Sequence, residues 1–276
     1  MAHKNLEQLN KLINHLKTDF SLYIHIDRNS QIHIKNTFNV HTIKKFRSYW
    51  GSYNFVLATR ELMKIASKNN HLRYLLISGQ DLPIISNQDI IEFFKGNKNN
   101  YIHGEKLPAY SLWAELPEGG FERLRYYYFH DYNSKKLMKY ISAAHLLLHS
   151  FQDLLSIYRK IPDNLYGGSN WWNLTHEAVM ICLGKMYDKA FMKPFKFSRL
   201  PDELVVQSIV YNSPKVFSTI ISDDLRYIDW SLGPTPKILI NEDYDKIMTS
   251  GKLFARKFDD SIDAQIIERI YKSKLC

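Results

Sequence analysis

Residues 73–79 read RYLLISG, a continuous apolar run that a glycine closes. Such a run is typical of a buried strand in a parallel sheet. Upstream, residues 53–68 have helical periodicity, and residues 20–27, FSLYIHID, alternate as the residues of a strand do. Because strands that alternate with helices form helix-covered sheets, this order predicts an α/β fold.

The rest of the chain continues this pattern. Apolar spacing and capping residues predict further helices at residues 4–18, 86–96, 174–187, 201–213, 242–251 and 263–274. Short strands are predicted at residues 101–104, 225–230 and 237–241. Residues 121–132 favour an edge strand, and residues 137–160 favour a helix. No repeat, low-complexity segment or linker divides the sequence, so we expect a single domain over residues 1–276.

Composition narrows the class of partner. The chain has 276 residues, a net charge of +9 and 14% aromatic residues. A basic balance favours anionic partners, namely nucleic acid, a membrane surface or phosphorylated small molecules. Aromatic side chains stack on sugars and on bases, so a carbohydrate or a nucleic-acid ligand fits. The sequence has no run of eighteen apolar residues and no secretory signal, so we expect a cytoplasmic protein.

Cysteine, metal and nucleotide signals are weak. Cys182 lies in the apolar run AVMICLG and reads as a small core residue, and Cys276 is the last residue. The sequence contains no HExxH, CxxC, GxGxxG or GxxxxGK[ST] motif. Its D-x-D pair, Asp243 and Asp245, falls in the first turn of a predicted helix, where acidic residues stabilise the helix end. We therefore interpret this pair as structural and expect no metal cofactor.

Two acidic residues follow predicted strands. Asp27 ends the strand FSLYIHID, and Asp81 follows the buried strand and Gly79. In open α/β sheets, ligands gather at the carboxyl ends of the strands. Each carboxylate is therefore a candidate ligand-binding group, and for each the alternative is a residue that only shapes a turn.

A second pair of motifs lies further along the chain. Residues 201–203, PDE, place Asp202 and Glu203 at the mouth of a predicted helix. Such carboxylates are usually first-turn charges, but two neighbours can raise a pKa and supply a general base. Arg256 and Lys257 form a cation pair that fits a pyrophosphate or, alternatively, a solvated surface.

Taken in order, several stretches of the chain resemble one family, the core-2/I-branching β-1,6-N-acetylglucosaminyltransferases and their bacterial relatives, which include peptide O-xylosyltransferases. The stretches are AHKNLEQL (2–9), YIHIDRNS (23–30), WGSYNFVLAT (50–59), YLLISGQDLPI (74–84), GGSNWWNLTHEAV (167–179), PDELVVQSIV (201–210), LRYIDW (225–230) and LFARKFD (253–259). They run along nearly the whole chain, although none falls between residues 105 and 150. Each stretch is short, and the resemblance rests on all eight occurring in the same order as in the family.

The resemblance implies a GT-A-like fold with a central, mostly parallel sheet flanked by helices. Relatives have an apolar strand just before the Ala2-His3 dipeptide, and this first strand is missing here. The resemblance also implies a UDP-sugar donor, inversion at the anomeric carbon and independence from a divalent metal. Without a metal ion, Arg or Lys side chains must stabilise the departing UDP.

The resemblance assigns roles to individual residues. Glu203 would be the general base that deprotonates the acceptor hydroxyl in a single displacement. Donor-binding residues would be Asp27 at the uridine, Trp50 on the uracil, Gly168 and Ser169 near the donor sugar, and Arg256 and Lys257 at the diphosphate. Acceptor-binding residues would be Trp171, Trp172 and Trp230. Asp81, Asp202 and Lys237 are further candidates, and Lys237 is the nearest match to a second phosphate-binding cation.

The expected function is therefore an inverting transfer of a sugar, GlcNAc in the first instance, from UDP to a glycan or glycoconjugate acceptor. Association with the inner face of the cytoplasmic membrane would suit the basic charge and a role in polysaccharide biosynthesis. Two alternatives remain open. One is a catalytically impaired relative that binds UDP or sugar, and the other is a basic nucleic-acid-binding protein, which the absence of a concentrated basic stripe disfavours.

Overall fold

The computed structural model describes residues 5–112, 116–129, 138–233 and 235–274. The chain forms two compact units. Unit 1 contains Met1–Lys45, Leu75–Lys98 and Asp223–Cys276, and unit 2 contains Phe46–Tyr74 and Asn99–Ser222. Each unit is thus assembled from separate stretches of sequence. The expectation of a single domain stays a prediction, as does the expected missing strand, whose place in relatives is before Ala2.

Unit 1 contains two small sheets. Strands β1 (Leu22–His25) and β2 (Val40–Ile43) pair in parallel. In the second sheet, β11 (Phe254–Arg256) lies between β10 (Arg226–Ile228), its parallel neighbour, and β4 (Asp81–Pro83), its antiparallel neighbour. The helices of this unit are α1 (Leu6–Leu16), α3 (Asn87–Phe94), α10 (Tyr244–Met248) and α11 (Ala264–Lys274), with a 3₁₀ turn at Asn241–Asp243 before α10.

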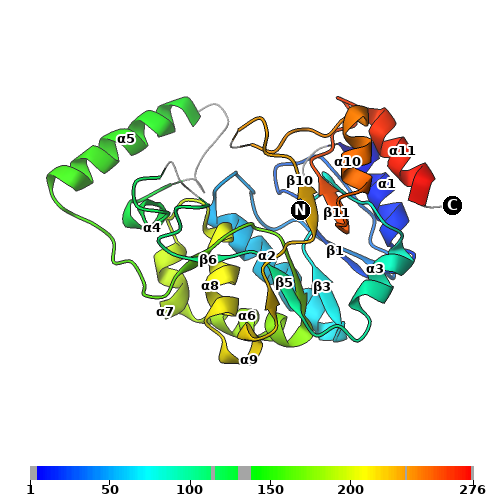
Figure 1. Cartoon of the computed structure of the whole chain (residues 1–276). Coiled ribbons are helices and arrows are strands. Elements are labelled where there is room, and N and C mark those ends of the chain that lie inside the picture. Colours follow the sequence, from blue (N-terminus) through cyan, green and yellow to red (C-terminus); the bar gives the residue numbers. More distant parts are fainter. Residues whose placement is uncertain (1–4, 113–115, 130–137, 234, 275–276) are drawn as a thin grey trace. The chain divides into compact units, whose positions relative to one another are not determined.

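The core of unit 1 explains why these elements form. Figure 1 shows α1 and α11 next to each other in this unit. Their apolar faces, Leu12 and Leu16 on α1 and Ile266 and Ile270 on α11, are buried with Leu82 of β4 in one hydrophobic cluster. The helical spacing of apolar residues in the sequence therefore corresponds to the side of each helix that packs.

Unit 2 is built on a four-stranded sheet with the order β3 (Arg73–Leu75), β8 (Trp172–Thr175), β5 (Asn100–Ile102) and β9 (Ile220–Ile221). Strand β5 runs antiparallel to β8 and parallel to β9. A separate antiparallel pair is formed by β6 (Glu105–Lys106) and β7 (Tyr166–Gly167).

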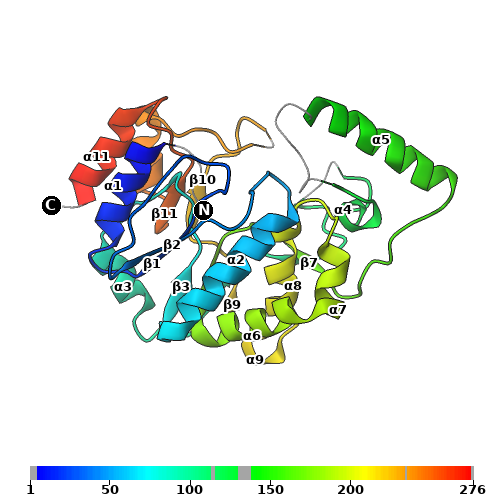
Figure 2. The same cartoon turned by 180° about the vertical axis from the view of Figure 1, so that it is seen from behind.

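The helices of unit 2 are shown from the opposite side in Figure 2. They are α2 (Tyr53–Ala66), followed by a 3₁₀ turn at Ser67–Asn69, then α4 (Glu122–Arg125), α5 (Met138–Leu154), α6 (His176–Tyr187), α7 (Lys189–Met192), α8 (Val205–Tyr211) and α9 (Pro214–Phe217). Further 3₁₀ turns lie at Lys193–Phe195 and at Pro201–Glu203. Cys182 of α6 is fully buried, which confirms its reading as a core residue.

The structure confirms a mixed α/β architecture of sheets flanked by helices, and it corrects several details. The sheets are mixed rather than mostly parallel, because β4, β6 and β8 each have an antiparallel partner. Residues 237–241 form no strand. The backbone N–H groups of Lys237 and Leu239 instead donate to the carbonyls of Asp229 and Lys257, at 2.9 and 2.8 Å.

Two further segments differ from their predicted form. Residues 121–132 were expected to hold an edge strand, but the described part contains the short helix α4 followed by irregular chain. Residues 201–213 were expected to form one helix. They form a 3₁₀ turn at Pro201–Glu203, and α8 begins only after it. In the described part of the chain, no helix is long and apolar enough to cross a membrane.

Candidate active site

The Pro201–Glu203 turn of unit 2 holds the carboxylate that the sequence singles out as a base. Leu200, just before the turn, has a left-handed backbone, with φ 51°, and its N–H donates to the carbonyl of Gly51 at 3.1 Å. This bond joins the turn to the WGS segment, where Gly51 also has a positive φ of 77°. The loop that carries Trp50 and the turn that carries Glu203 are therefore neighbours within unit 2.

Glu203 is held by an arginine that the sequence analysis did not identify. Arg123 Nη1 donates to Glu203 Oε2 at 2.6 Å, as a charge-assisted hydrogen bond. The Arg123 side chain is 7% exposed and that of Glu203 is 28% exposed. A buried cation thus fixes one oxygen of a carboxylate that stays partly open to solvent. Such a carboxylate is oriented and accessible to a hydroxyl group, as a general base must be.

Asp202, the neighbour of Glu203, has a different environment. Its Oδ2 accepts a hydrogen bond from Asn170 Nδ2 at 3.0 Å, while its Oδ1 is buried and has no hydrogen-bond partner among the described residues. Burial, and then the charge of Glu203, raise the pKa of Asp202 to about 7. Asp202 also lines a cavity of about 10 Å³, together with Val56, Thr59, Asn170, Met186, Val205 and Val206. Such a volume holds about one water molecule.

The GGSN loop, residues 167–170, is bound to this turn and to α8. The N–H of Gly168 donates to the carbonyl of Glu203 at 3.0 Å, and Gln207 Nε2 donates to the carbonyl of Ser169 at 2.6 Å. A Cβ at Gly168 would lie 2.1 Å from the carbonyl oxygen of His103, so only glycine fits there. The two stretches are therefore adjacent in unit 2, and the donor-sugar role of Gly168 and Ser169 stays a prediction.

The tryptophans of unit 2 differ strongly in exposure. Trp172 lies in β8 opposite Ile102 and is 4% exposed, and Trp171 is 9% exposed. Trp50 is 68% exposed, and the guanidinium of Arg199 lies 5.8 Å from the centre of its ring. An exposed indole can stack on a planar base, whereas a buried one offers a ligand little surface. The contact roles of all three stay predictions, and the burial of Trp172 favours packing in its case.

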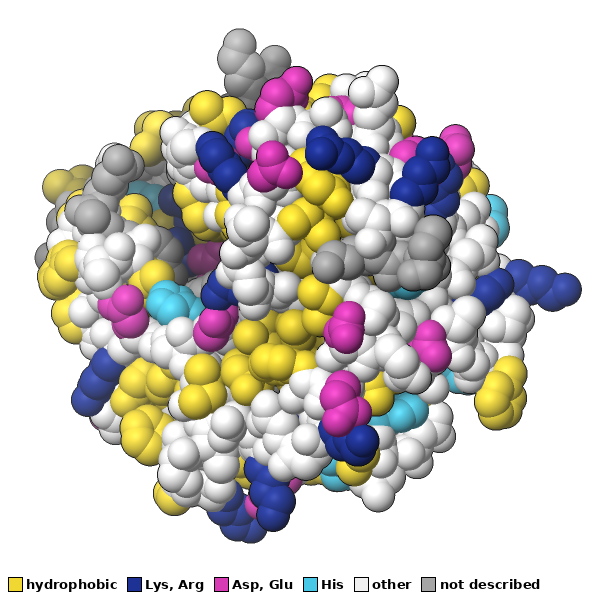
Figure 3. All heavy atoms as spheres, turned by 45° about the vertical axis from the view of Figure 1, so that its right-hand side comes forward, with side chains coloured by type: hydrophobic (Ala, Val, Ile, Leu, Met, Phe, Trp, Pro, Cys, Tyr) yellow, Lys and Arg dark blue, Asp and Glu magenta, His cyan; other side chains and the backbone are white. Residues whose placement is uncertain are grey.

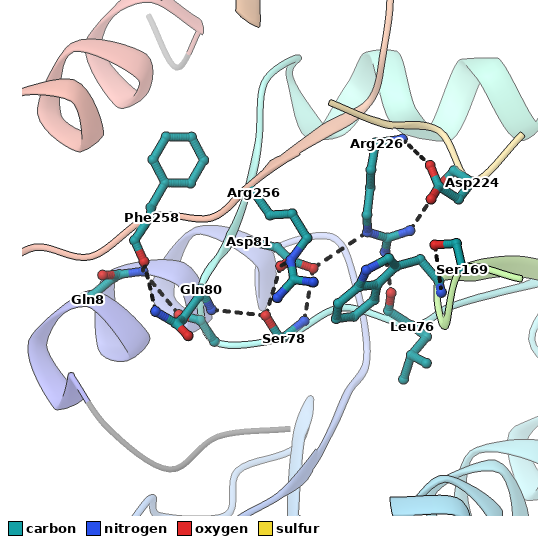
Figure 4. A network of polar contacts seen from close by, with 12 residues as sticks. Gln8, Leu76, Ser78, Gln80, Asp81, Ser169, Asp224, Arg226, Arg256 and Phe258 are labelled. Carbon is teal, nitrogen blue, oxygen red and sulfur yellow. Dashed lines mark hydrogen bonds and ion pairs between the residues drawn. The ribbon is translucent and has the colours of Figure 1, made fainter. Parts of the chain in front are cut away.

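Unit 1 contains a charged network around Asp81, shown in Figure 4. The Asp81 side chain is completely buried and its Oδ1 and Oδ2 accept from Oγ and N of Ser78, at 2.7 and 3.0 Å. Nε of Arg256 lies 3.2 Å from Asp81 Oδ1, and Nε of Arg226 lies 3.5 Å from Asp81 Oδ2. One carboxylate therefore fixes two guanidinium groups.

The two arginines of this network differ in accessibility. Arg226 is fully buried, and burial lowers the pKa of its guanidinium; it also donates to the backbone carbonyls of Leu76 and Asp224. The Arg256 side chain is 17% exposed. Asp81 thus orients one partly exposed cation at the end of β11, and Lys257 is the next residue. Arg226 was not identified from the sequence, where it is only part of a predicted strand.

The remaining predicted residues of unit 1 make local contacts. Asp27 Oδ1 accepts from the N–H of Asn29 at 2.7 Å, in a turn after β1. Lys237 Nζ donates to Asp243 Oδ1 at 2.7 Å, and this bond is the main cause of the raised pKa of Lys237. Trp230 is 54% exposed in a turn after β10. These contacts define the local structure and leave the assigned ligand contacts as predictions.

The D-x-D pair has a structural position. Asp243 is buried, and besides Lys237 it accepts from the N–H of Ile240 at 3.0 Å, so it caps the turn before α10. Among the residues that the structure describes, no group of three or more His, Cys, Asp or Glu side chains is placed to hold a metal ion.

The mixed α/β architecture of sheets flanked by helices fits a glycosyltransferase of the GT-A-like class. The family model of the Core-2/I-Branching enzyme matches residues 2–115 and 121–249. The chain therefore belongs to the core-2/I-branching family, whose members are glycosyltransferases. No curated protein matches the sequence significantly. The match covers most of residues 105–150, where the sequence motifs quoted above gave no signal, and it ends before Arg256 and Lys257.

Proposed function

We propose that the protein transfers a sugar, GlcNAc in the first instance, from a UDP-sugar to a hydroxyl group of a glycan or glycoconjugate, with inversion at the anomeric carbon. The observation that carries this proposal is the Glu203–Arg123 pair, in a chain whose family consists of glycosyltransferases. The partly exposed carboxylate of Glu203 takes the proton of the acceptor hydroxyl as the hydroxyl oxygen attacks the anomeric carbon. The bond from this carbon to the UDP oxygen breaks in the same step.

Arg123 has a positioning role in this proposal. Its guanidinium keeps the Glu203 carboxylate in one orientation and satisfies one of its oxygens. Because the Arg123 side chain is buried, it leaves the exposed part of the Glu203 carboxylate open to the acceptor.

The leaving diphosphate is proposed to be stabilised by side chains rather than by a divalent cation. Arg256 is the best-supported ligand, because the buried Asp81 fixes its position while it stays partly exposed. Lys257 is assigned beside it by the family resemblance, and Lys237, already paired with Asp243, is a weaker candidate. Asp27 and the exposed Trp50 are the proposed uridine ligands.

The donor is identified by a binding screen followed by a transfer assay. UDP-GlcNAc, UDP-xylose, UDP-GalNAc and UDP-glucose are compared by thermal shift, because a ligand that binds only the folded state raises the melting temperature. We expect one UDP-sugar to raise it most and to be consumed when acceptor glycans are added. We also expect EDTA to leave turnover unchanged.

Each arm of the experiment has an outcome that contradicts part of the proposal. If no UDP-sugar changes the melting temperature, the donor class is wrong. If EDTA abolishes turnover, the cationic side chains do not replace a metal ion. If UDP binds without hydrolysis or transfer, the protein is the sugar-nucleotide-binding alternative.

The nucleic-acid-binding alternative finds little support on the face drawn in Figure 3. On the face drawn in Figure 3, Lys and Arg side chains occur singly or in small groups and are interspersed with Asp and Glu. A nucleic-acid site would gather them into a patch or stripe.

A further inference from the structure

Helix α5 of unit 2 has an exposed apolar side. Leu146, Leu147, Phe151 and Leu154 have relative exposures of 69%, 73%, 58% and 78%. Figures 1 and 2 both show α5 along the edge of its unit, with one side facing away from α4. Single exposed leucines are ordinary on protein surfaces, but a run of them on one helix marks an interaction surface.

The opposite side of α5 is fixed to the protein by polar contacts. His145 Nε2 accepts from the N–H of Phe129 at 3.0 Å, and His149 Nε2 lies 3.2 Å from the carbonyl of Tyr127. Gln152 is 4% exposed, and its Oε1 accepts from the N–H of Tyr127 at 3.2 Å. The usual pattern of a surface helix is thus reversed, because polar groups pack inward and leucines point outward.

Charge is nearly absent from this helix. Residues 143–152 read AAHLLLHSFQ and contain no Asp, Glu, Lys or Arg. The carboxylate that follows, Asp153, accepts hydrogen bonds from the hydroxyls of Tyr126 and Tyr158, at 2.8 and 3.1 Å. Over residues 143–152, the exposed side therefore has no charged group of its own to favour water over a less polar surface.

Basic side chains lie close to the end of α5. Arg159 donates to the carbonyls of Pro194 and Lys196, both at 2.6 Å, and so joins the segment after α5 to the Lys193–Phe195 turn. Lys160, Lys193 and Lys196 are exposed there. Residues 188–199 carry one acidic residue, Asp188, which caps α7, and four basic ones, Lys189, Lys193, Lys196 and Arg199.

We propose that α5 docks on an anionic lipid bilayer, with the leucine face in the acyl boundary and the adjoining lysines at the headgroups. An apolar helix side with basic residues at its border is the arrangement that binds such an interface. Helix α5 spans Met138–Leu154, shorter than the roughly 20 residues that cross a bilayer, so it lies along the surface. Docking would keep the protein near lipid-linked or cell-surface acceptors, and it does not depend on the proposed sugar transfer.

Vesicle binding by the full chain tests this proposal. Sedimentation is measured with vesicles of phosphatidylcholine alone and with vesicles containing about a third phosphatidylglycerol. We expect binding to the anionic vesicles that weakens with salt, and at least about tenfold weaker binding to the neutral ones. The double substitution Leu147→Glu, Leu154→Glu should weaken binding to anionic vesicles at least about tenfold. The substitution Leu72→Glu, at a residue of the same unit with 90% exposure, is the matched control and should leave it unchanged.

The lysines are tested separately. Lys193→Gln with Lys196→Gln should weaken binding on the order of tenfold, since each basic residue near an anionic surface contributes to binding. Lys215→Gln is the control, because Lys215 is exposed on α9, which both views place away from α5. Lys193→Gln with Lys196→Gln removes two charges and Lys215→Gln removes one, so an equal loss per lysine removed would show that only net charge matters and would contradict the proposed surface.

A fluorescent label reports the docked face even if a charged variant folds poorly. In a Cys276→Ser background, the remaining Cys182 is fully buried, so Leu147→Cys can be labelled selectively with an environment-sensitive dye. Anionic vesicles should shift its emission to the blue, whereas a label introduced through Leu72→Cys should not respond. The absence of a blue shift at position 147 would overturn the proposal. A concentration-dependent dimer that the Leu147→Glu, Leu154→Glu variant abolishes would also overturn it, because the leucine face would then join two copies of the chain.

Discussion

Asp202 and Glu203 are neighbours in one turn, yet their surroundings assign them different roles. Glu203 is paired with Arg123 and partly exposed, whereas Asp202 accepts from Asn170 through one oxygen and buries the other, which has no partner among the described residues. Burial favours the neutral form of a carboxyl group, and a cationic partner favours the ionised form. The environment therefore makes Glu203 the candidate base and makes Asp202 a group that holds a proton near neutral pH.

The raised pKa of Asp202 predicts a dependence of stability on pH. The folded-state value, about 7, lies above the value of about 3.9 for an unfolded chain, so the folded state binds the extra proton. The contribution of Asp202 to stability is full below pH 4 and is lost as pH rises to 7. We expect Asp202→Asn to remove this fall, measured by denaturant unfolding between pH 4 and 8. The difference in unfolding free energy between the two proteins cancels the contributions of all the groups that they share. A difference that stays constant from pH 4 to 8 would therefore contradict the raised pKa of Asp202.

Reasoning from the sequence identified the acidic members of both sites and one cationic partner, Arg256, but neither Arg123 nor Arg226. Glu203 and Asp81 stand in short motifs that end near turns, so their positions were visible. Arg123 lies in a segment whose pattern favours an edge strand, and Arg226 lies within another predicted strand, so neither pattern marks its arginine as a site residue. Which carboxylate each arginine meets depends on segments 80 and 145 residues away, and no local pattern encodes such a pairing.

At the scale of elements, helices were more predictable than strands. The spacing and capping residues of α1, α2, α3 and α11 are contained within each segment, and Ser86 caps α3 by accepting from the N–H of Asp89, as expected. A strand exists only with a partner. The run RYLLISG therefore gives a strand of three residues, and KILIN gives none. The mixed sheet has the same origin, because β4 pairs with β11 and not with the strand before it.

The GGSN loop provides a test of packing between elements. Gly168→Ala would place a Cβ 2.1 Å from a backbone carbonyl oxygen, which cannot move as a side chain can. We expect a loss of stability of at least about 1–3 kcal/mol. Gly184→Ala is the matched control, because Gly184 lies within α6 and its Cβ would meet no atom within 4 Å. There we expect a gain of up to about 1 kcal/mol, because alanine favours the helix. Equal effects at the two sites would contradict the close approach at Gly168.

At the scale of the whole molecule, the chain passes between its two units several times. Unit 1 is made from three separate stretches and unit 2 from two. Neither unit can be removed by cutting the chain once, so we expect both to unfold in one cooperative transition. This expectation agrees with the single domain that the sequence indicates.

Asp81 tests both the charged network and this cooperativity. Asp81→Asn leaves two arginines without a buried anion, and we expect a loss of about 3–5 kcal/mol. Asp223→Asn, which breaks the half-exposed pair with Lys252, should cost less than about 1 kcal/mol. Calorimetry of Asp81→Asn and of Gly168→Ala should show the same single transition at a lower temperature. Two transitions, each sensitive to only one substitution, would show that the units are separate domains.

The most direct test of the account is the turnover of Glu203→Gln beside its affinity for UDP. The amide keeps the shape of the side chain but cannot accept the proton of the acceptor hydroxyl. We expect kcat to fall by a factor on the order of 10² to 10⁴, with UDP binding by calorimetry unchanged. Glu177→Gln, the same change at an exposed glutamate at the start of α6, should leave both values as they are. Near-normal turnover of Glu203→Gln with intact UDP binding would show that another group is the base.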